Sequence, residues 1–186
     1  MIRVWDEDQD LDAALEQDKA MCTDLALAEC DALSPYGREF IQSRLNASRA
    51  TFLHWHALTL CEGPERGFVI FSRESASGKG HKRRRRCSYI EIFWLSLAPG
   101  LRGKGLGKRL LDAAIAKGRE LWPEVTEARL HVMLNNPHAR GFYESRGFKE
   151  QQRKKDYPEA GYTSFRMTLL LDDVPVPAAA AAKAVT

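Results

Sequence analysis

Apolar positions recur along the chain with two periods, and these periods predict which segments form helices and which form strands. Helical spacing predicts helices over residues 10–33, 38–47, 104–121 and 137–145. Runs rich in β-branched and aromatic residues, bounded by turn residues, predict strands over residues 2–5, 51–60, 67–73, 88–98, 128–134, 148–153 and 162–171. This order of elements is typical of an α/β domain built around a mixed sheet.

Residues 88–98 form the most apolar of the predicted strands. Apolar side chains occur at both odd- and even-numbered positions, so they point to both faces of the strand. We therefore expect this strand to be covered on both faces, as a central strand would be. Glu91 is the only acidic residue in it. Pro99 and Gly100 end the strand, and a glycine-rich segment then leads into the helix predicted over 104–121.

The length of 186 residues fits one domain, which we expect to span residues 1–171. Residues 74–87 are polar, basic and rich in serine and glycine, and predict a basic loop within it. Residues 172–186 begin with Val-Pro-Val-Pro after two aspartates and continue with alanines, a composition that predicts a disordered tail.

The net charge of +3 conceals a strong asymmetry. Residues 1–31 carry ten acidic and two basic side chains, whereas residues 79–86 carry six basic ones and no acid. The excess of basic charge is therefore concentrated in one predicted loop, which argues against a dedicated nucleic-acid-binding domain. A solvated loop, a nuclear-localisation-like signal, a clamp for an acidic protein and a phosphate or RNA contact all remain open.

Other sequence features narrow the class of protein. No apolar run is long enough to cross a bilayer, and the acidic N-terminus has no signal-peptide core, so we expect a cytoplasmic protein, with the basic run also compatible with the nucleus. The four cysteines lie far apart without a C-x-x-C pair, so we expect no metal site.

The segment from Arg102 to Gly107 has a glycine at every second position and stands between a strand and a helix. Glycines let a ligand approach the backbone, and the first turn of a helix offers unpaired N–H groups to phosphate. The segment fails the Walker A pattern and the G-x-G-x-x-G dinucleotide pattern, but matches R-x-x-G-x-G at every fixed position.

Two blocks of sequence together carry a family resemblance. Residues 97–111, around this glycine segment, resemble the central motif of the GNAT (Gcn5-related N-acetyltransferase) superfamily. Residues 134–148, with Asn136, Ala139, Phe142-Tyr143 and Gly147-Phe148, are similar to the strand-then-helix signature of the same superfamily. The resemblance implies a mixed central sheet of about seven strands, with helices on both faces and with parallel strands 4 and 5 splayed apart.

The resemblance also implies a binding mode for acetyl-CoA as co-substrate. The backbone of Leu95, Ser96 and Leu97 would pair with the pantetheine arm, and the Leu95 amide would donate to the thioester carbonyl. Asn136 would hydrogen-bond the same arm. The pyrophosphate would lie on the glycine segment, formed by Arg102, Gly103, Lys104, Gly105, Leu106, Gly107 and Lys108.

Two residues are candidates for proton transfer. Tyr143 matches the position of the acid that protonates the departing thiolate, although a core aromatic residue would also fit an amphipathic helix. Glu91 matches the position of the general base in the histone-acetyltransferase branch of the superfamily. Burial in an apolar strand would raise the pKa of Glu91 towards neutrality. At the solvent end of the strand, Glu91 would keep the pKa of an exposed carboxyl group.

The sequence as a whole predicts an N-acetyltransferase that moves an acetyl group to a primary amine by direct attack in a ternary complex. The acceptor stays open between a protein N-terminus, a lysine and a small amine, and both a monomer and a homodimer are compatible with the chain. A binding module of the same fold, which holds acyl-CoA or uses its basic loop on RNA or a partner without turnover, is the alternative.

Overall fold

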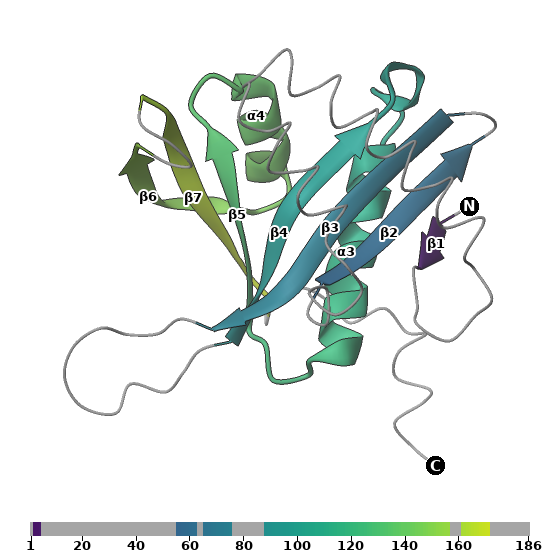
Figure 1. Cartoon of the computed structure of the whole chain (residues 1–186), viewed down its shortest axis with the longest axis horizontal. Helices are drawn as coiled ribbons and strands as arrows, with labels where there is room; N and C mark the ends of the chain where they lie inside the picture. The colour runs from purple at the N-terminus through teal and green to yellow at the C-terminus, as the bar shows by residue number, and fades with distance from the viewer. Residues whose placement is uncertain (1, 5–54, 63–64, 76–87, 157–160, 172–186) are drawn as a thin grey trace. The chain divides into compact units, whose positions relative to one another are not determined.

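The computed structural model of the chain describes residues 2–4, 55–62, 65–75, 88–156 and 161–171 (Figure 1). The helices expected over 10–33 and 38–47, the basic run 79–86 and the tail from residue 172 lie outside these residues. The described elements follow the predicted order. They are β1 (Ile2–Val4), β2 (Trp55–Glu62), β3 (Glu65–Ser75), β4 (Ser88–Leu97), the 3-10 turn η2 (Pro99–Leu101), α3 (Leu106–Leu121), β5 (Glu127–Met133), α4 (Pro137–Ser145), β6 (Lys149–Lys155) and β7 (Thr163–Leu170).

Among the described residues, the strands form one mixed sheet in the order β1-β2-β3-β4-β5-β7-β6 (Figure 1). β4 and β5 run parallel, with Ile90 opposite Ala128 and Ile92 opposite Leu130. The pairs β1–β2, β5–β7 and β6–β7 are antiparallel. The predicted α/β fold with a mixed sheet is therefore confirmed.

Some boundaries differ from the sequence prediction. α3 begins at Leu106 and not at residue 104, because residues 99–101 form a 3-10 turn and Gly103 and Gly105 have positive φ. β3 continues to Ser75, so the first two residues of the expected basic loop are strand. The pattern of apolar residues does not define where a helix or strand ends, because the ends depend on the local geometry of turns and caps.

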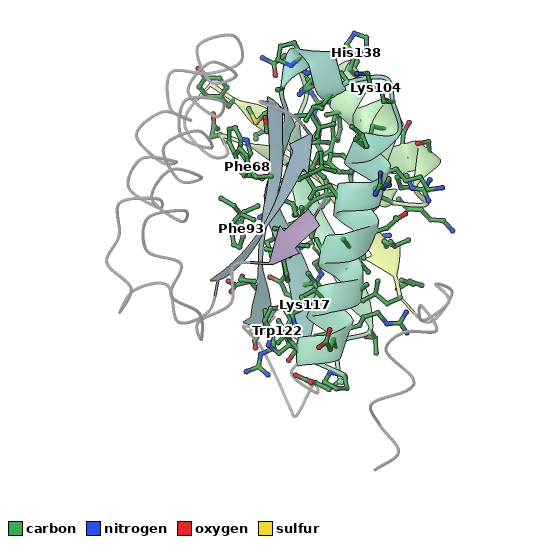
Figure 2. The ribbon with its side chains drawn as sticks, turned by 90° about the vertical axis from the view of Figure 1, so that its right-hand side faces the viewer. Phe68, Phe93, Lys104, Lys117, Trp122 and His138 are labelled. Atoms are coloured by element: carbon green, nitrogen blue, oxygen red, sulfur yellow. The ribbon has the colours of Figure 1, made fainter. Side chains whose placement is uncertain are left out.

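The chain divides into two compact units, one of residues 1–70 and 94–111 and the other of residues 71–93 and 112–186. In the first unit, Leu58 and Leu60 of β2, Phe68 and Val69 of β3, and Leu110 of α3 are buried. Figure 2 shows the Phe68 side chain on the face of β3 turned away from α3. The expectation of a single domain over 1–171 stays a prediction.

In the second unit, α3 packs closely on the start of β4. A Cβ atom at Gly118 would lie 2.5 Å from Cδ1 of Ile90, so this glycine allows the helix to approach the strand. The neighbouring side chains Ala128, Leu130 and Met167 are at most 1% exposed. The strands place the polar side chains of Glu91 and Arg129 on the face opposite to Ile90 and Ala128, because neighbouring residues in a strand point to opposite faces.

Within the described part of the chain, no helix is both long and apolar enough to cross a membrane.

Candidate functional site

The glycine segment that follows β4 is held in a turn that leads into α3. Gly103 and Gly105 have φ values of +72° and +73°. A Cβ atom at either position would meet nothing within 4 Å, so the backbone conformation and not lack of space requires glycine there. Gly107, the third glycine, is buried in the first turn of α3 next to the buried Leu106.

The amino-terminal end of α3 is strongly positive. Its first turn contains no acidic residue, and Lys104, Lys108 and Arg109 are all exposed around it. Figure 2 shows Lys104 at this end of the helix and Lys117 towards the other. Because the first N–H groups of a helix have no partner within it, this end provides both hydrogen-bond donors and charge for an anion such as pyrophosphate.

Arg102 has a structural role in the same turn. Its Nε donates a hydrogen bond to the carbonyl oxygen of Leu97 at 3.0 Å, and its backbone N–H donates to Pro99 at 3.2 Å. These bonds join the end of β4 to the turn. The expected contact of Arg102 with pyrophosphate stays a prediction.

The last residues of β4 carry buried polar atoms without protein partners. Oγ of Ser96 and Nε1 of Trp94 are both buried and have no hydrogen-bond partner. Leu95 and Leu97 on either side of Ser96 are half-buried. Buried polar groups without hydrogen-bond partners are rare in folded proteins.

Glu91 lies in the second unit, on β4 opposite Arg129 of β5, and is only 9% exposed. Burial raises its pKa to about 7, helped by the carboxylate of Glu74, while Arg129, Lys154 and Arg166 act in the opposite direction. Glu91 is therefore not at a solvent end of the strand. A carboxyl group that titrates near neutrality can accept and release a proton at physiological pH.

Cations surround Glu91 on this face of the sheet. The guanidinium carbon of Arg129 lies 3.9 Å from the ring centre of Tyr89, and the same side chain is paired with Glu127. Burial, then the charge of Glu91, raises the pKa of Tyr89 above its ordinary value. Tyr89 therefore stays protonated at neutral pH.

His131 also lies near Glu91 in charge terms, on β5, with Nδ1 3.4 Å from Oγ of Ser164. Burial lowers its pKa to about 4, and the charges of Lys154 and Arg166 add to this effect. The imidazole is therefore neutral at pH 7, and it accepts a proton less readily than Glu91. His138, the other histidine near the second motif, is exposed on α4, as Figure 2 shows.

The second motif forms the start of α4. Oδ1 of Asn136 caps the helix by accepting the Ala139 N–H at 3.0 Å, and Pro137 occupies the first turn. Because the cap uses the carbonyl oxygen of this side chain, its amide nitrogen is the group left to donate to a ligand. The expected contact of Asn136 with the pantetheine arm stays a prediction.

Tyr143 is buried in α4, with an exposed fraction of 9%. Its ring packs edge-on against Phe142, with centroids 5.1 Å apart, and against Phe148 at 5.7 Å. The residue is therefore a core aromatic, and this packing fixes the direction in which its hydroxyl points. Its role as an acid stays a prediction.

Sequence reasoning missed the arginines of the polar sheet face. Arg129 and Arg166 come from different strands, and the pairing of β5 with β7 brings them to one face. The signal was the alternation of polar and apolar residues in β5, where Glu127, Arg129 and His131 alternate with buried residues. Alternation predicts a polar face but not which strand lies beside it.

Comparison with solved structures shows a shared fold. NAA60 of Arabidopsis thaliana, solved with acetyl-CoA, is 17% identical with a TM-score of 0.60, covering 92% of this chain and 99% of that one. The ribosomal-protein-S18-alanine N-acetyltransferase of Escherichia coli is 17% identical with a TM-score of 0.58, covering 91% and 94%. An acetyltransferase of Bacillus subtilis, solved with CoA, is 19% identical with a TM-score of 0.56, covering 91% and 97%.

The comparison with curated proteins finds no match. The family model described as acetyltransferase (GNAT) family matches residues 32–148. Both sequence motifs lie within these residues, as do Glu91 and Tyr143. Because the match covers more than half of the chain, the chain belongs to the acetyltransferase (GNAT) family.

Proposed function

We propose that this protein transfers the acetyl group of acetyl-CoA to a primary amine by direct attack in a ternary complex. The observation that carries the proposal is Glu91, a buried carboxyl group with a pKa of about 7 on the strand that leads into the glycine segment. An ammonium group cannot attack a thioester, so the reaction needs a base that is ionised near neutral pH. Glu91 meets this requirement.

The chain offers groups suited to each part of acetyl-CoA. The segment Arg102–Lys108 would hold the pyrophosphate, with the N–H groups and cations at the start of α3 supporting this assignment. The backbone of Leu95, Ser96 and Leu97 would bind the pantetheine arm, together with the amide of Asn136.

Bound acetyl-CoA supplies an activated acetyl group as a thioester. Glu91 takes a proton from the acceptor ammonium, and the freed amine nitrogen bonds to the carbonyl carbon as the carbon–sulfur bond breaks. Tyr143 donates a proton to the departing sulfur, and the second proton, which the nitrogen loses as the amide forms, restores the Tyr143 phenol. The proton on Glu91 then leaves to solvent. The Leu95 N–H donates to the carbonyl oxygen as negative charge develops there, an effect worth about 3 kcal/mol when well placed.

The acceptor belongs to the class of primary amines. The name of the Escherichia coli structure identifies that protein as an N-acetyltransferase for an alanine of a ribosomal protein. This supports a protein N-terminus as one acceptor for the present chain, beside a lysine side chain and a small amine.

Thiol release from acetyl-CoA, measured over peptides, lysine and polyamines, tests this proposal. We expect release with at least one amine and formation of an equal amount of amide. Binding of acetyl-CoA without release on any amine would favour the alternative, a binding module.

Two glycine variants test the cofactor assignment by calorimetry. Gly105→Asp places a carboxylate at the start of α3, and we expect acetyl-CoA binding to weaken at least about tenfold through repulsion. Gly161→Asp is the matched control, because this glycine also has positive φ, +87°, and open space around it. Equal affinity of the two variants would contradict the assignment of the pyrophosphate to the glycine segment.

A further inference from the structure

Arg129 lies beside Glu91 in the sheet but forms its ion pair elsewhere. The parallel register of β4 and β5 places the two residues opposite each other, on the face turned away from Ile90 and Ala128. Neighbouring strands lie about 4.8 Å apart, so the side chain of Arg129 is long enough to reach the Glu91 carboxyl group. Within the described part of the chain, however, the carboxylate that Arg129 pairs with is that of Glu127.

Two contacts hold the guanidinium group of Arg129. Its Nη2 donates a hydrogen bond to Oε1 of Glu127, two residues earlier on β5 and therefore on the same face. Its central carbon lies 3.9 Å from the ring centre of Tyr89, two residues before Glu91 on β4. Both partners precede the level of Glu91 and Arg129, so the arginine side chain turns back along the strands.

The pair between Glu127 and Arg129 is well suited to fix this position. Each of the two side chains is only 16% exposed. A partly buried pair is screened by salt much less than a surface pair, and a planar guanidinium group stacks readily on an aromatic ring. The pair and the ring of Tyr89 thus hold the same group from two sides.

Other described groups on this face act on Glu91 without touching Arg129. Glu74, on the neighbouring strand β3, accepts a hydrogen bond from Oγ of Ser72 at 3.0 Å, and its charge raises the pKa of Glu91. His131, two residues after Arg129 on β5, is neutral at pH 7 because its pKa is about 4.

The cations of this face do not act equally. Arg129 has the largest effect of the three cations that lower the pKa of Glu91, ahead of Lys154 of β6 and Arg166 of β7. The place of the Arg129 guanidinium group therefore matters most for the charge state of Glu91.

We propose that Glu127 is a positioning residue for the base, because its ion pair with Arg129 keeps the guanidinium group on Tyr89 and off the Glu91 carboxylate. The inference rests on the proposed function, in which Glu91 takes a proton from the acceptor amine. Without Glu127, the guanidinium group would be free to form a two-bonded pair with Glu91. Such a pair lowers the pKa of a carboxyl group by about 1 to 3 units, which makes it a weaker base.

The titration of Glu91 tests the proposal without the need for catalysis. Carboxyl ¹³C spectra of the full chain, labelled at glutamate, report it, and Glu91→Gln identifies the signal by its loss. In Glu127→Gln, which keeps the shape of the side chain, we expect the midpoint to fall by about one pH unit or more. Glu144→Gln is the matched control, because it opens another arginine–glutamate pair, with Arg140 on α4, and should leave the midpoint unchanged.

Removal of Arg129 separates positioning from the charge of Glu127 itself. Arg129→Gln alone should raise the midpoint of Glu91, because a cation is lost. Addition of Glu127→Gln to this variant should cause no further fall, because no guanidinium group is left to move. An equal fall with and without Arg129 would show that Glu127 acts by its charge alone, and would overturn the proposal.

The Nε–H signal of Arg129, in protein labelled at arginine, is a second readout that needs only Glu127→Gln. We expect it to move little while Glu91 titrates in the wild-type protein, and to follow that titration in the variant, where the two groups pair. A signal that behaves alike in both proteins would also overturn the proposal.

The pH profile of kcat/KM distinguishes this proposal from the proposed function. In Glu127→Gln the step assigned to Glu91 should move to lower pH together with the ¹³C midpoint. A midpoint that moves while the step stays at its wild-type pH would contradict Glu91 as the base. A midpoint that stays at its wild-type value in Glu127→Gln would overturn the positioning role of Glu127.

Discussion

At Glu91, burial and the neighbouring carboxylate of Glu74 outweigh three cations, so the carboxyl group titrates near neutrality. The sequence indicated this residue because it is the only acid in an apolar strand. The sequence did not indicate Arg129, Lys154 and Arg166, which oppose the shift, because they come from strands whose pairing a single sequence does not reveal.

Glu91→Gln should remove the base while keeping the shape of the side chain. We expect kcat to fall about 100-fold at pH 7, the usual size of a general-base contribution. In the wild-type protein kcat/KM should rise with pH and level off above about pH 7, because only the ionised carboxylate accepts a proton. In the variant this step should disappear from the pH profile.

Glu120→Gln is the control for Glu91→Gln, because it removes the same charge from an exposed helix position. An unchanged step at pH 7 in the Glu91→Gln variant would show that another group is the base.

Tyr143→Phe separates the catalytic interpretation of this residue from the packing one. Phenylalanine keeps the ring contacts with Phe142 and Phe148, so the free energy of unfolding should change by no more than about 1 kcal/mol. We expect kcat to fall about 100-fold because the proton donor is lost. A variant of normal kcat would leave Tyr143 as a core aromatic only.

At the scale of elements, the contact between α3 and β4 depends on Gly118. A Cβ atom there would stand 2.5 Å from Cδ1 and 3.0 Å from Cγ1 of Ile90, a residue with no exposed surface. The sequence predicted the helix from its apolar positions. It did not predict which helical residue touches the sheet, because that depends on how the two elements pack.

Gly118→Ala should therefore lower the free energy of unfolding by about 1–3 kcal/mol through overpacking. Ile90→Val removes Cδ1 and alone should cost about 1 kcal/mol. The double variant should be more stable than the sum of the two losses predicts, because the shortened side chain makes room for the new methyl group.

A urea-unfolding cycle over these variants measures the coupling. Gly141→Ala in α4, where nothing lies within 4 Å, is the matched helix control and should be neutral or stabilising. Strictly additive losses at positions 118 and 90 would contradict the close contact.

The elements of the described chain were largely predictable from residue pattern, and the exceptions have local causes. The start of α3 moved to Leu106 because two positive-φ glycines precede it. The glycine segment and the Asn136 cap were recognisable because their residue types are set by local backbone geometry. The stacking of Arg129 on Tyr89 was not, because it depends on side chains brought together by strand pairing.

At the scale of the whole molecule, Glu91 and His131 make opposite contributions to stability. The folded protein raises the pKa of Glu91 from 4.5 to about 7, so stability falls as pH rises through that window. It lowers the pKa of His131 from 6.5 to about 4, so stability rises with pH through that window. Each effect amounts to about 3 kcal/mol, and the two oppose each other between pH 4.5 and 6.5.

Single substitutions should separate the pH dependence of stability that comes from Glu91 from the one that comes from His131. Between pH 4.5 and 6.5 the free energy of unfolding of Glu91→Gln should rise by about 2 kcal/mol more than that of the wild-type protein. That of His131→Gln should fall by a similar amount relative to wild type. Urea unfolding at several pH values measures both, and parallel curves for all three proteins would contradict the assigned titrations.

The central claim is that the molecule transfers acetyl groups to amines, and one measurement tests it most directly. Wild-type protein, acetyl-CoA and a panel of amines are incubated, and free thiol and amide product are quantified together by mass spectrometry. We predict one amide for each thiol released, with the rate of both about 100-fold lower in the Glu91→Gln variant. Thiol release without amide, or equal product from wild type and Glu91→Gln, would contradict the account.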